Sequence, residues 1–357
     1  MTLPEGTMLP SELERKQIFY WLKRISSYTA WNRILGYYKA WADTVEQSVR
    51  IAVDKGWIKE TGMPESDLIA ILKALSHFEE GVRRLRSGDK RVFKRDANGE
   101  FAMGNIQYNY FRELLHRIDT GDMGIDEAHT PLWDEFKHTL NLLGRASDEC
   151  WPEIIESRWI GDPSRTVYGD YLREHLPKMP FPCPLPDTLE PNNNLLIPTG
   201  KNIPCSGIWE PIEAPIKKGF SLFRNEDASH GPFKPAGCMN YLHAGSPAPQ
   251  ASLETTDANP NADVTWRLLW RDDRYEDGTI PAEEASYVFL EPQTVAPVPV
   301  AQVVVPSNIH VAKTGQAAPY AGRWLVENDL QASVTLAQGE PLPQHNGRVV
   351  RWVLAES

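Results

Sequence analysis

The chain has 357 residues, of which 41% are hydrophobic and 24% charged, and its formal net charge is -11. This balance is typical of a folded globular protein, and the length predicts about two domains. A strongly acidic protein favours a basic partner over the phosphate backbone of nucleic acid. The N-terminal residues lack the basic and apolar segments of a secretory signal, and no stretch is apolar enough to cross a membrane, so we expect a cytoplasmic protein.

Charge and proline content both change near the middle of the chain. Residues 1–178 hold 25 basic and 28 acidic residues, whereas residues 179–357 hold 12 and 20. Only 7 of the 29 prolines precede residue 180, and proline is rare inside helices. We therefore predict an α+β protein with an all-α helical bundle at 1–178, a proline-rich linker at 179–215 and an acidic, mainly antiparallel β domain with long loops at 216–357.

In the first half, apolar residues at spacings of three and four predict five helices. Their expected starts lie near Ser11, Trp31, Pro64, Tyr108 and Thr130. Ser11 is a plausible N-cap for the first helix. The fifth helix has the clearest start signal, with Thr130 as the N-cap and Pro131 at the first helical position.

In the second half, short apolar segments separated by turn residues predict strands. They cover 266–271, 286–290, 302–305, 323–326 and 349–354. Residues 266–284, WRLLWRDDRYEDGTIPAEE, combine aromatic, basic and acidic side chains most densely. We predict that they form a hairpin whose acidic tip is exposed, and such a tip fits a basic partner better than a catalytic pocket.

Imidazole and thiolate side chains are the usual zinc ligands, and four of those in the second half form the most enzyme-like cluster. They are Cys205, His230, Cys238 and His243, but their spacing matches no zinc signature. A Cys–His nucleophilic pair drawn from the same residues lacks an accompanying oxyanion motif. Structural or surface roles, with reduced and mostly buried thiols, are the simpler interpretation.

The predicted hairpin tip partly resembles a calcium-binding loop, because Asp273, Asp277, Gly278 and Glu284 fall at suitable positions. Tyr275, however, occupies a position that needs a ligand, and Pro281 occupies another. An Asp-Gly turn with solvated acids is therefore favoured over a metal site. We expect no metal and no cofactor.

Several common catalytic motifs are missing from the sequence. The patterns GxxxxGK[ST], GxGxxG, GxSxG and HExxH do not occur, which disfavours nucleotide chemistry and two common hydrolase classes. The basic segment at 83–95 is more simply a solvated helix end than a binding site in so acidic a protein. Four tryptophans lie beside charged residues, which is typical of protein-interface anchors and also of sugar-binding platforms. They are Trp209, Trp266, Trp270 and Trp324.

Five further segments are distinctive as strings. They are FYWLKRISSYTAW at 19–31, CSGIWEPI at 205–212, MNYLHAGSPAP at 239–249, GRWLVENDL at 322–330 and LPQHNGRVVRWVLA at 342–355. Together with residues 266–284, they resemble a family of bacterial immunity proteins that protect their hosts against polymorphic toxins. The resemblance covers most of both halves of the chain.

The resemblance implies a protein that is encoded beside a secreted effector of the type VI secretion class and that binds and blocks this effector. Similar proteins guard against nuclease toxins of restriction-endonuclease fold. A nuclease presents a basic groove, which an acidic surface can occupy as a DNA mimic or cover by steric occlusion. Both modes fit the sequence.

We therefore expect a non-enzymatic cytoplasmic inhibitor that contacts its cognate toxin and does not contact nucleic acid, a membrane or a small-molecule ligand. The expected toxin contacts on the hairpin are Trp270, Asp272, Asp273, Tyr275, Glu276 and Asp277. A neighbouring loop is expected to add Trp209, Glu210 and His243. Two alternatives are a metal- or Cys/His-dependent hydrolase and a carbohydrate-binding module.

Overall fold

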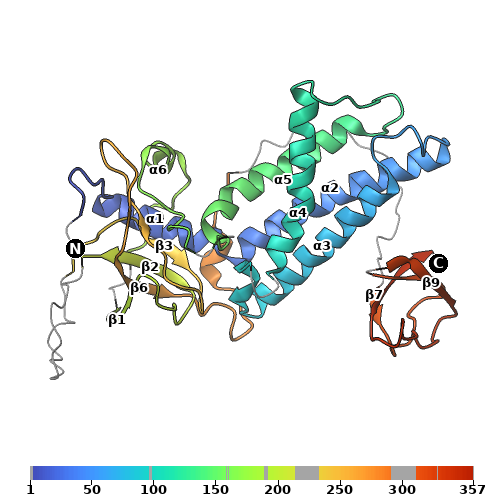
Figure 1. Cartoon of the computed structure of the whole chain (residues 1–357). Helices are drawn as coiled ribbons and strands as arrows, with labels where there is room; N and C mark the ends of the chain where they lie inside the picture. The colour runs from blue at the N-terminus through green and yellow to red at the C-terminus, as the bar shows by residue number, and fades with distance from the viewer. Residues whose placement is uncertain are drawn as a thin grey trace. The chain divides into compact units, whose positions relative to one another are not determined.

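The computed structural model describes residues 3–95, 99–157, 159, 161–188, 192–213, 233–290, 311–327 and 329–356. N-terminal helices are followed by antiparallel sheets, which confirms the predicted α+β class (Figure 1). The chain divides into two compact units, Met1–Gln293 and Thr294–Ser357. The helices and the first sheet thus share one unit, and this division differs from the predicted boundaries at 178 and 215.

The first unit begins with a helical bundle in which α2 contacts α3 and α5, and α3 contacts α4. The helices described in the first unit, with 3₁₀ helices marked η, are α1 (Glu12–Ile25), α2 (Tyr28–Asp54), α3 (Glu65–Arg86), η1 (Lys90–Phe93), α4 (Glu100–Asp119), α5 (Trp133–Ile154), α6 (Asp170–His175), η2 (Leu176–Lys178) and η4 (Ala282–Ser286). The predicted cap of α1 is confirmed: Ser11 Oγ accepts a hydrogen bond from Glu14 N, and Ser11 N donates to Glu14 Oε2 at 2.8 Å. Within the described residues, none of the helices combines the length and the hydropathy needed to span a membrane.

Aromatic side chains fill the centre of the bundle. Trp31 is fully buried and stacks on Phe101, with ring centroids 4.2 Å apart. Trp21 and Trp41 are at most 3% exposed, as the helical spacing of these tryptophans predicts. Such large apolar side chains contribute most of the stabilising burial in a helical core.

The start of α5 differs from the prediction. The helix begins at Trp133, after Leu132 in a left-handed conformation with φ 57°. The hydroxyl of the buried Thr130 instead donates to the Asp126 carbonyl at 2.7 Å and accepts from Gly62 N at 2.9 Å. The predicted N-cap Thr130 and first helical residue Pro131 were therefore wrong, because Thr130 joins two loops that are distant in sequence.

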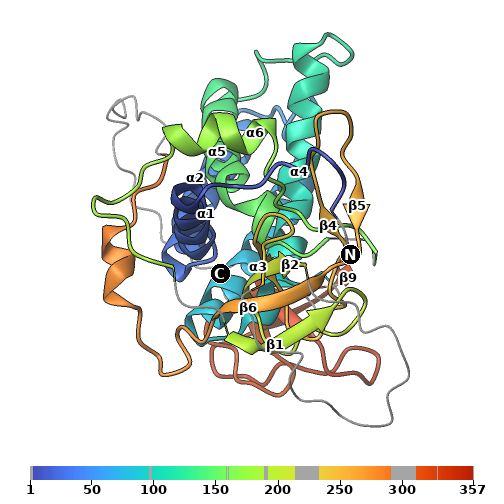
Figure 2. The same cartoon turned by 90° about the vertical axis from the view of Figure 1, so that its left-hand side faces the viewer.

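The first sheet is antiparallel, with strand order β1-β6-β2-β3, and Figure 2 shows β6 between β1 and β2. The strands are β1 (Asn192–Pro198), β2 (Gly207–Ile212), β3 (Asn240–Leu242) and β6 (Thr265–Arg271), with a separate pair β4 (Ala251–Ser252) and β5 (Asn261–Ala262). Two of these strands lie in the range 179–215, which the sequence predicted to be a linker without regular structure. Proline is tolerated there because Pro198 ends β1 and only Pro211 lies inside β2.

The predicted hairpin at 266–284 is wrong beyond its first strand. β6 is present, but no return strand follows within the described residues, and η4 is a 3₁₀ helix. The predicted strand at 286–290 is also absent, and the one at 302–305 lies outside the described residues. The segment after β6 binds the junction of α1 and α2 instead of forming a second strand that pairs with β6.

The second unit holds another antiparallel sheet, with strand order β7-β10-β8-β9. Its strands are β7 (Val311–Lys313), β8 (Gly322–Val326), β9 (Asp329–Leu336) and β10 (Arg351–Glu356). The strand predicted at 323–326 is confirmed, and the one predicted at 349–354 begins two residues later. Trp324 and Trp352 are at most 3% exposed and form the centre of this small core.

Candidate functional site

The nine residues expected to contact a toxin differ sharply in exposure. Trp209, Glu210, His243, Asp272 and Tyr275 are at most 6% exposed. Trp270 is half-buried, whereas Asp273, Glu276 and Asp277 are exposed. In this structure, therefore, only the last three present carboxylates freely to a partner, and we call residues 273–277 the acidic turn.

Asp272 lies at the centre of a buried network that joins the first sheet to the helices. Arg274 donates to both carboxylate oxygens at 2.8 Å, and Tyr241 Oη donates to Oδ2 at 2.9 Å. Lys90 Nζ is 3.5 Å from Oδ1 and donates to the Arg274 carbonyl at 2.8 Å. Burial alone would raise the pKa of Asp272, but Arg274 and Lys90 hold that pKa below its usual value. Asp272 is thus an internal counter-ion.

Tyr275 and Glu284 cap the N-terminus of α2. Tyr28 N donates to Tyr275 Oη at 2.7 Å, and that hydroxyl donates to Glu284 Oε1. Glu284 Oε2 accepts from Thr29 N at 3.0 Å and from Thr29 Oγ1 at 2.7 Å. Because a helix N-terminus carries unpaired N–H groups and a partial positive charge, this buried carboxylate is stabilising there. The segment after β6 therefore has an architectural role.

Glu210 holds α1 against the first sheet. Arg15 of α1 donates to Oε1 from Nη2 at 2.6 Å, and Arg267 of β6 donates to Oε2 from Nη2 at 2.6 Å. Glu210 is 1% exposed, so the carboxylate at the centre of this Arg–Glu–Arg triad is buried. No sequence pattern in β2 distinguishes this glutamate from a surface contact residue.

Three of the four tryptophans proposed as interface or sugar-binding anchors are core residues. Trp209, Trp266 and Trp324 are 0% exposed, so they are not the half-buried anchors that their charged neighbours predicted. Trp270 packs edge-on against Phe19 and lies 4.7 Å from the Arg274 guanidinium. The large exposed tryptophan is instead Trp159, at 67%, which sequence analysis missed because its neighbours show no strand or helix period.

The acidic turn is held rigidly although its carboxylates are exposed. Tyr275 has a left-handed backbone with φ 72°, and a side chain at Gly88 would come within 3.2 Å of the Glu276 backbone. Hydrogen bonds from Thr279 to Asp277, including one from the backbone at 2.9 Å, lower the pKa of Asp277. Across the described ranges, no ion pair within 4.0 Å engages Asp273, Glu276 or Asp277. The turn thus offers three exposed carboxylates on a fixed backbone.

The residues of the zinc and Cys–His alternatives do not form a recognisable site. In the described part of the chain, no group of three His, Cys, Asp or Glu side chains is placed to hold a metal ion. His230 lies outside the described residues. Burial raises the pKa of the Cys238 thiol far above its usual value, which disfavours the thiolate needed for ligation or attack. Of the calcium-loop residues, Glu284 is committed to the α2 cap.

Two family models match this chain. Residues 9–165, from α1 to α5, match Immunity protein 71. Residues 188–288, which hold the first sheet and the acidic turn, match Immunity protein 72. No curated protein and no solved structure matches the chain. The two family matches, one over the helical bundle and one over the first sheet, support an immunity protein of the polymorphic-toxin kind.

Proposed function

We propose that this protein binds a cognate secreted antibacterial toxin in the cytoplasm and neutralises it without catalysis, and that the toxin is a nuclease delivered by type VI secretion. The two matches to immunity-protein families carry the proposal. The nuclease assignment rests on the sequence resemblance and on the net charge of -11, which suits a basic substrate groove.

The acidic turn is the surface that best fits this function. Asp273, Glu276 and Asp277 are exposed and lack ion-pair partners among the described residues. They stand on a backbone fixed by Arg274 and Tyr275, so little conformational entropy is lost when they bind. We propose that the turn steers a basic groove toward the inhibitor and covers it.

Neutralising the turn tests this role. The triple variant Asp273→Asn, Glu276→Gln and Asp277→Asn keeps side-chain size and the acceptor for Thr279, and we expect it to fold normally. Its association rate with the toxin should fall by about tenfold at low ionic strength, because electrostatic steering depends on these charges. Surface plasmon resonance with the toxin encoded beside this chain, at two salt concentrations, measures the rate.

The matched control neutralises three exposed acids elsewhere. The variant Glu113→Gln, Asp119→Asn and Glu127→Gln changes the net charge equally, on α4 and in the segment that follows it. It should retain most of the association rate. Equal losses in the two variants would contradict the acidic turn as a contact surface, and failure of the unaltered chain to bind the toxin would contradict the proposed function.

A further inference from the structure

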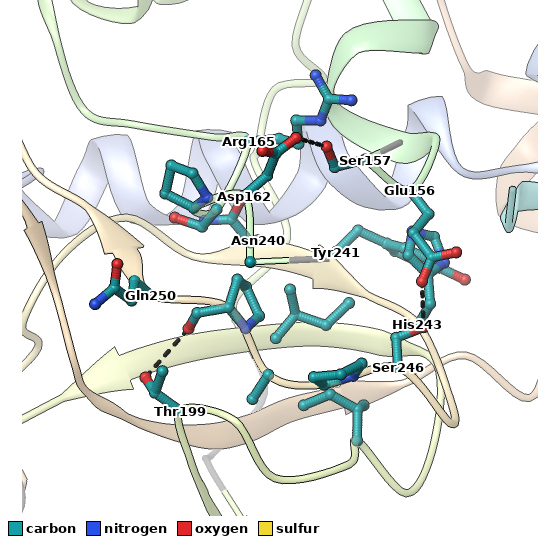
Figure 3. A pocket seen from close by; sticks show the side chains of 18 of the residues that line it. Glu156, Ser157, Asp162, Arg165, Thr199, Asn240, Tyr241, His243, Ser246 and Gln250 are labelled. Atoms are coloured by element: carbon teal, nitrogen blue, oxygen red, sulfur yellow. Dashed lines mark hydrogen bonds between the residues drawn. The ribbon is translucent and has the colours of Figure 1, made fainter. Parts of the chain in front are cut away.

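A cleft of about 610 Å³ lies between the segment that follows α5 and the first sheet (Figure 3). The region matched by Immunity protein 71 lines it with residues up to Arg165, and the region matched by Immunity protein 72 lines it from Thr199 onward. Apolar side chains include Ile155, Ile203, Leu242, Pro247 and Pro249. The cleft is therefore a joint feature of both matched regions and is separate from the acidic turn.

Four carboxylates line this cleft, and none has an ion-pair partner within 4.0 Å among the described residues. They are Glu153, Glu156, Asp162 and Asp263. Three are oriented by neutral donors: Ser246 Oγ binds Glu156, Ser157 Oγ binds Asp162, and Gln250 Nε2 binds Asp263 at 3.0 Å. Figure 3 shows the hydrogen bond between Ser246 and Glu156 at the right and the one between Ser157 and Asp162 at the top. Two cations, Arg95 and Arg165, also line the cleft, so acids outnumber bases.

Glu153 is the least satisfied of these acids. Among the residues that the structure describes, no side chain donates a hydrogen bond to its carboxylate, which accepts one from its own backbone N–H. Burial raises the pKa of Glu153 to about 7, and Arg165 only partly opposes this shift. A carboxylate in such surroundings gains stability when a cation enters beside it.

The lining also offers an unused neutral acceptor. His243 is 6% exposed, and its Nδ1 has no hydrogen-bond partner. Burial, followed by the charge of Lys94, lowers the pKa of His243 to about 3, so the ring is neutral at physiological pH. A hydrogen bond with the backbone of Ile154 engages the ring, which leaves Nδ1 as the acceptor.

The four carboxylates and the Nδ1 atom of His243 are therefore all hydrogen-bond acceptors. Their complement is a cation with several N–H donors, and a guanidinium group carries five in one plane. Trp159 borders the cleft at 67% exposure, which places an aromatic side chain at its rim. The apolar side chains suit the aliphatic stem of the same residue.

We propose that this cleft is a second toxin-contact site that receives an arginine side chain of the partner. The inference rests on the proposed function, since it takes the partner to be a basic protein. It assigns the guanidinium to Glu153 and the neighbouring acceptors, with Trp159 at the rim.

A peptide titration tests the cleft without the toxin. The probe is N-acetyl-Gly-Arg-Gly-amide, titrated calorimetrically into the full chain, with the citrulline peptide as the uncharged analogue of equal shape. We expect millimolar binding of the arginine peptide, weaker binding of the lysine peptide and none of the citrulline peptide. Absence of arginine-peptide binding, equal citrulline binding or equal lysine binding would overturn the assignment.

Glu153→Gln should weaken arginine-peptide binding about tenfold, whereas Glu113→Gln on α4 should leave it unchanged. Binding to the intact chain should also strengthen about tenfold from pH 6 to pH 8, because the guanidinium selects the ionised form of Glu153. Glu153 borders this cleft and also a second one. The other ionisable groups that line either cleft are Arg24, Arg95, Asp148, Glu149, Glu156, Asp162, Arg165, Tyr171, His175, Lys178, Tyr241, His243 and Asp263. Since these remain in Glu153→Gln, persistence of the full pH effect in that variant would contradict the role of Glu153.

The same variant separates this inference from the proposed function. If Glu153→Gln binds the toxin with unchanged affinity while the intact chain neutralises it, the cleft assignment fails and the function stands. If the intact chain does not bind the toxin, the function fails, and the peptide titration still decides the preference of the cleft. A loss of toxin affinity of about tenfold in Glu153→Gln, together with arginine-selective peptide binding, supports both.

Discussion

Replacing Asp272 by Asn is expected to lower the free energy of unfolding by about 3 to 5 kcal/mol, as when one partner of a buried ion pair is removed. The side chain of Asp272 is 0% exposed and faces Arg274 and Lys90, which are also buried. A neutral amide would leave Lys90 without this counter-ion and Arg274 with only Glu284, whose Oε1 lies 3.9 Å from Arg274 Nη1. It would also present an N–H pair toward Arg274 donors. Chemical denaturation at neutral pH, followed by tryptophan fluorescence, measures the change.

The adjacent residue supplies the matched control for this substitution. Asp273 is exposed and has no ion pair in the described part of the chain, so Asp273→Asn should change the unfolding free energy by less than about 0.5 kcal/mol. Similar small effects at both positions would contradict the buried network. A loss of toxin binding in Asp272→Asn would therefore have to be corrected for unfolding before any contact is assigned to Asp272.

The helical half could be predicted well because its signals are local. Ser11 and Glu14 are three residues apart, and the caps and apolar spacings that define α1 and α2 are visible within a few turns of sequence. The exception is instructive: Thr130 fits an N-cap pattern, yet its hydroxyl binds Gly62 N, 68 residues away in the chain. A local pattern predicts a cap only when no distant group competes for the same side chain.

The segment at 266–284 shows why the candidate site was harder to predict. Alternating apolar residues correctly indicated β6, but two later side chains of the segment are committed to distant partners. Tyr275 binds the backbone of Tyr28, 247 residues earlier, and Glu284 binds Thr29, 255 residues earlier. Charge next to an aromatic residue is the composition of a binding surface and also of a buried ionic joint, and only tertiary structure distinguishes the two.

Of the nine expected contact residues, three acids are exposed in the structure, whereas five others are buried. The cleft was not predicted, because its lining comes from segments that are far apart in the chain and have no motif in common. Trp159 was overlooked for the same reason. Its ring borders the same cleft as Glu153 and His243, which the sequence does not reveal.

Glu210→Ala is expected to destabilise the first unit by about 3 to 5 kcal/mol, because it removes the buried carboxylate that Arg15 and Arg267 share. Hydrogen exchange of the α1 amides should also accelerate, since Glu210 joins that helix to β2.

The control Glu12→Ala removes only the exposed partner of Arg15 and should cost less than about 1 kcal/mol. Equal destabilisation by Glu12→Ala and Glu210→Ala would contradict the buried triad. Replacing Arg15 and Arg267 by Met and Glu210 by Leu together should recover much of the stability lost in Glu210→Ala, because apolar side chains of similar size carry no desolvation penalty. If that triple variant still neutralises the toxin, the triad serves to hold α1 on the sheet, and Glu210 makes no contact that the toxin requires.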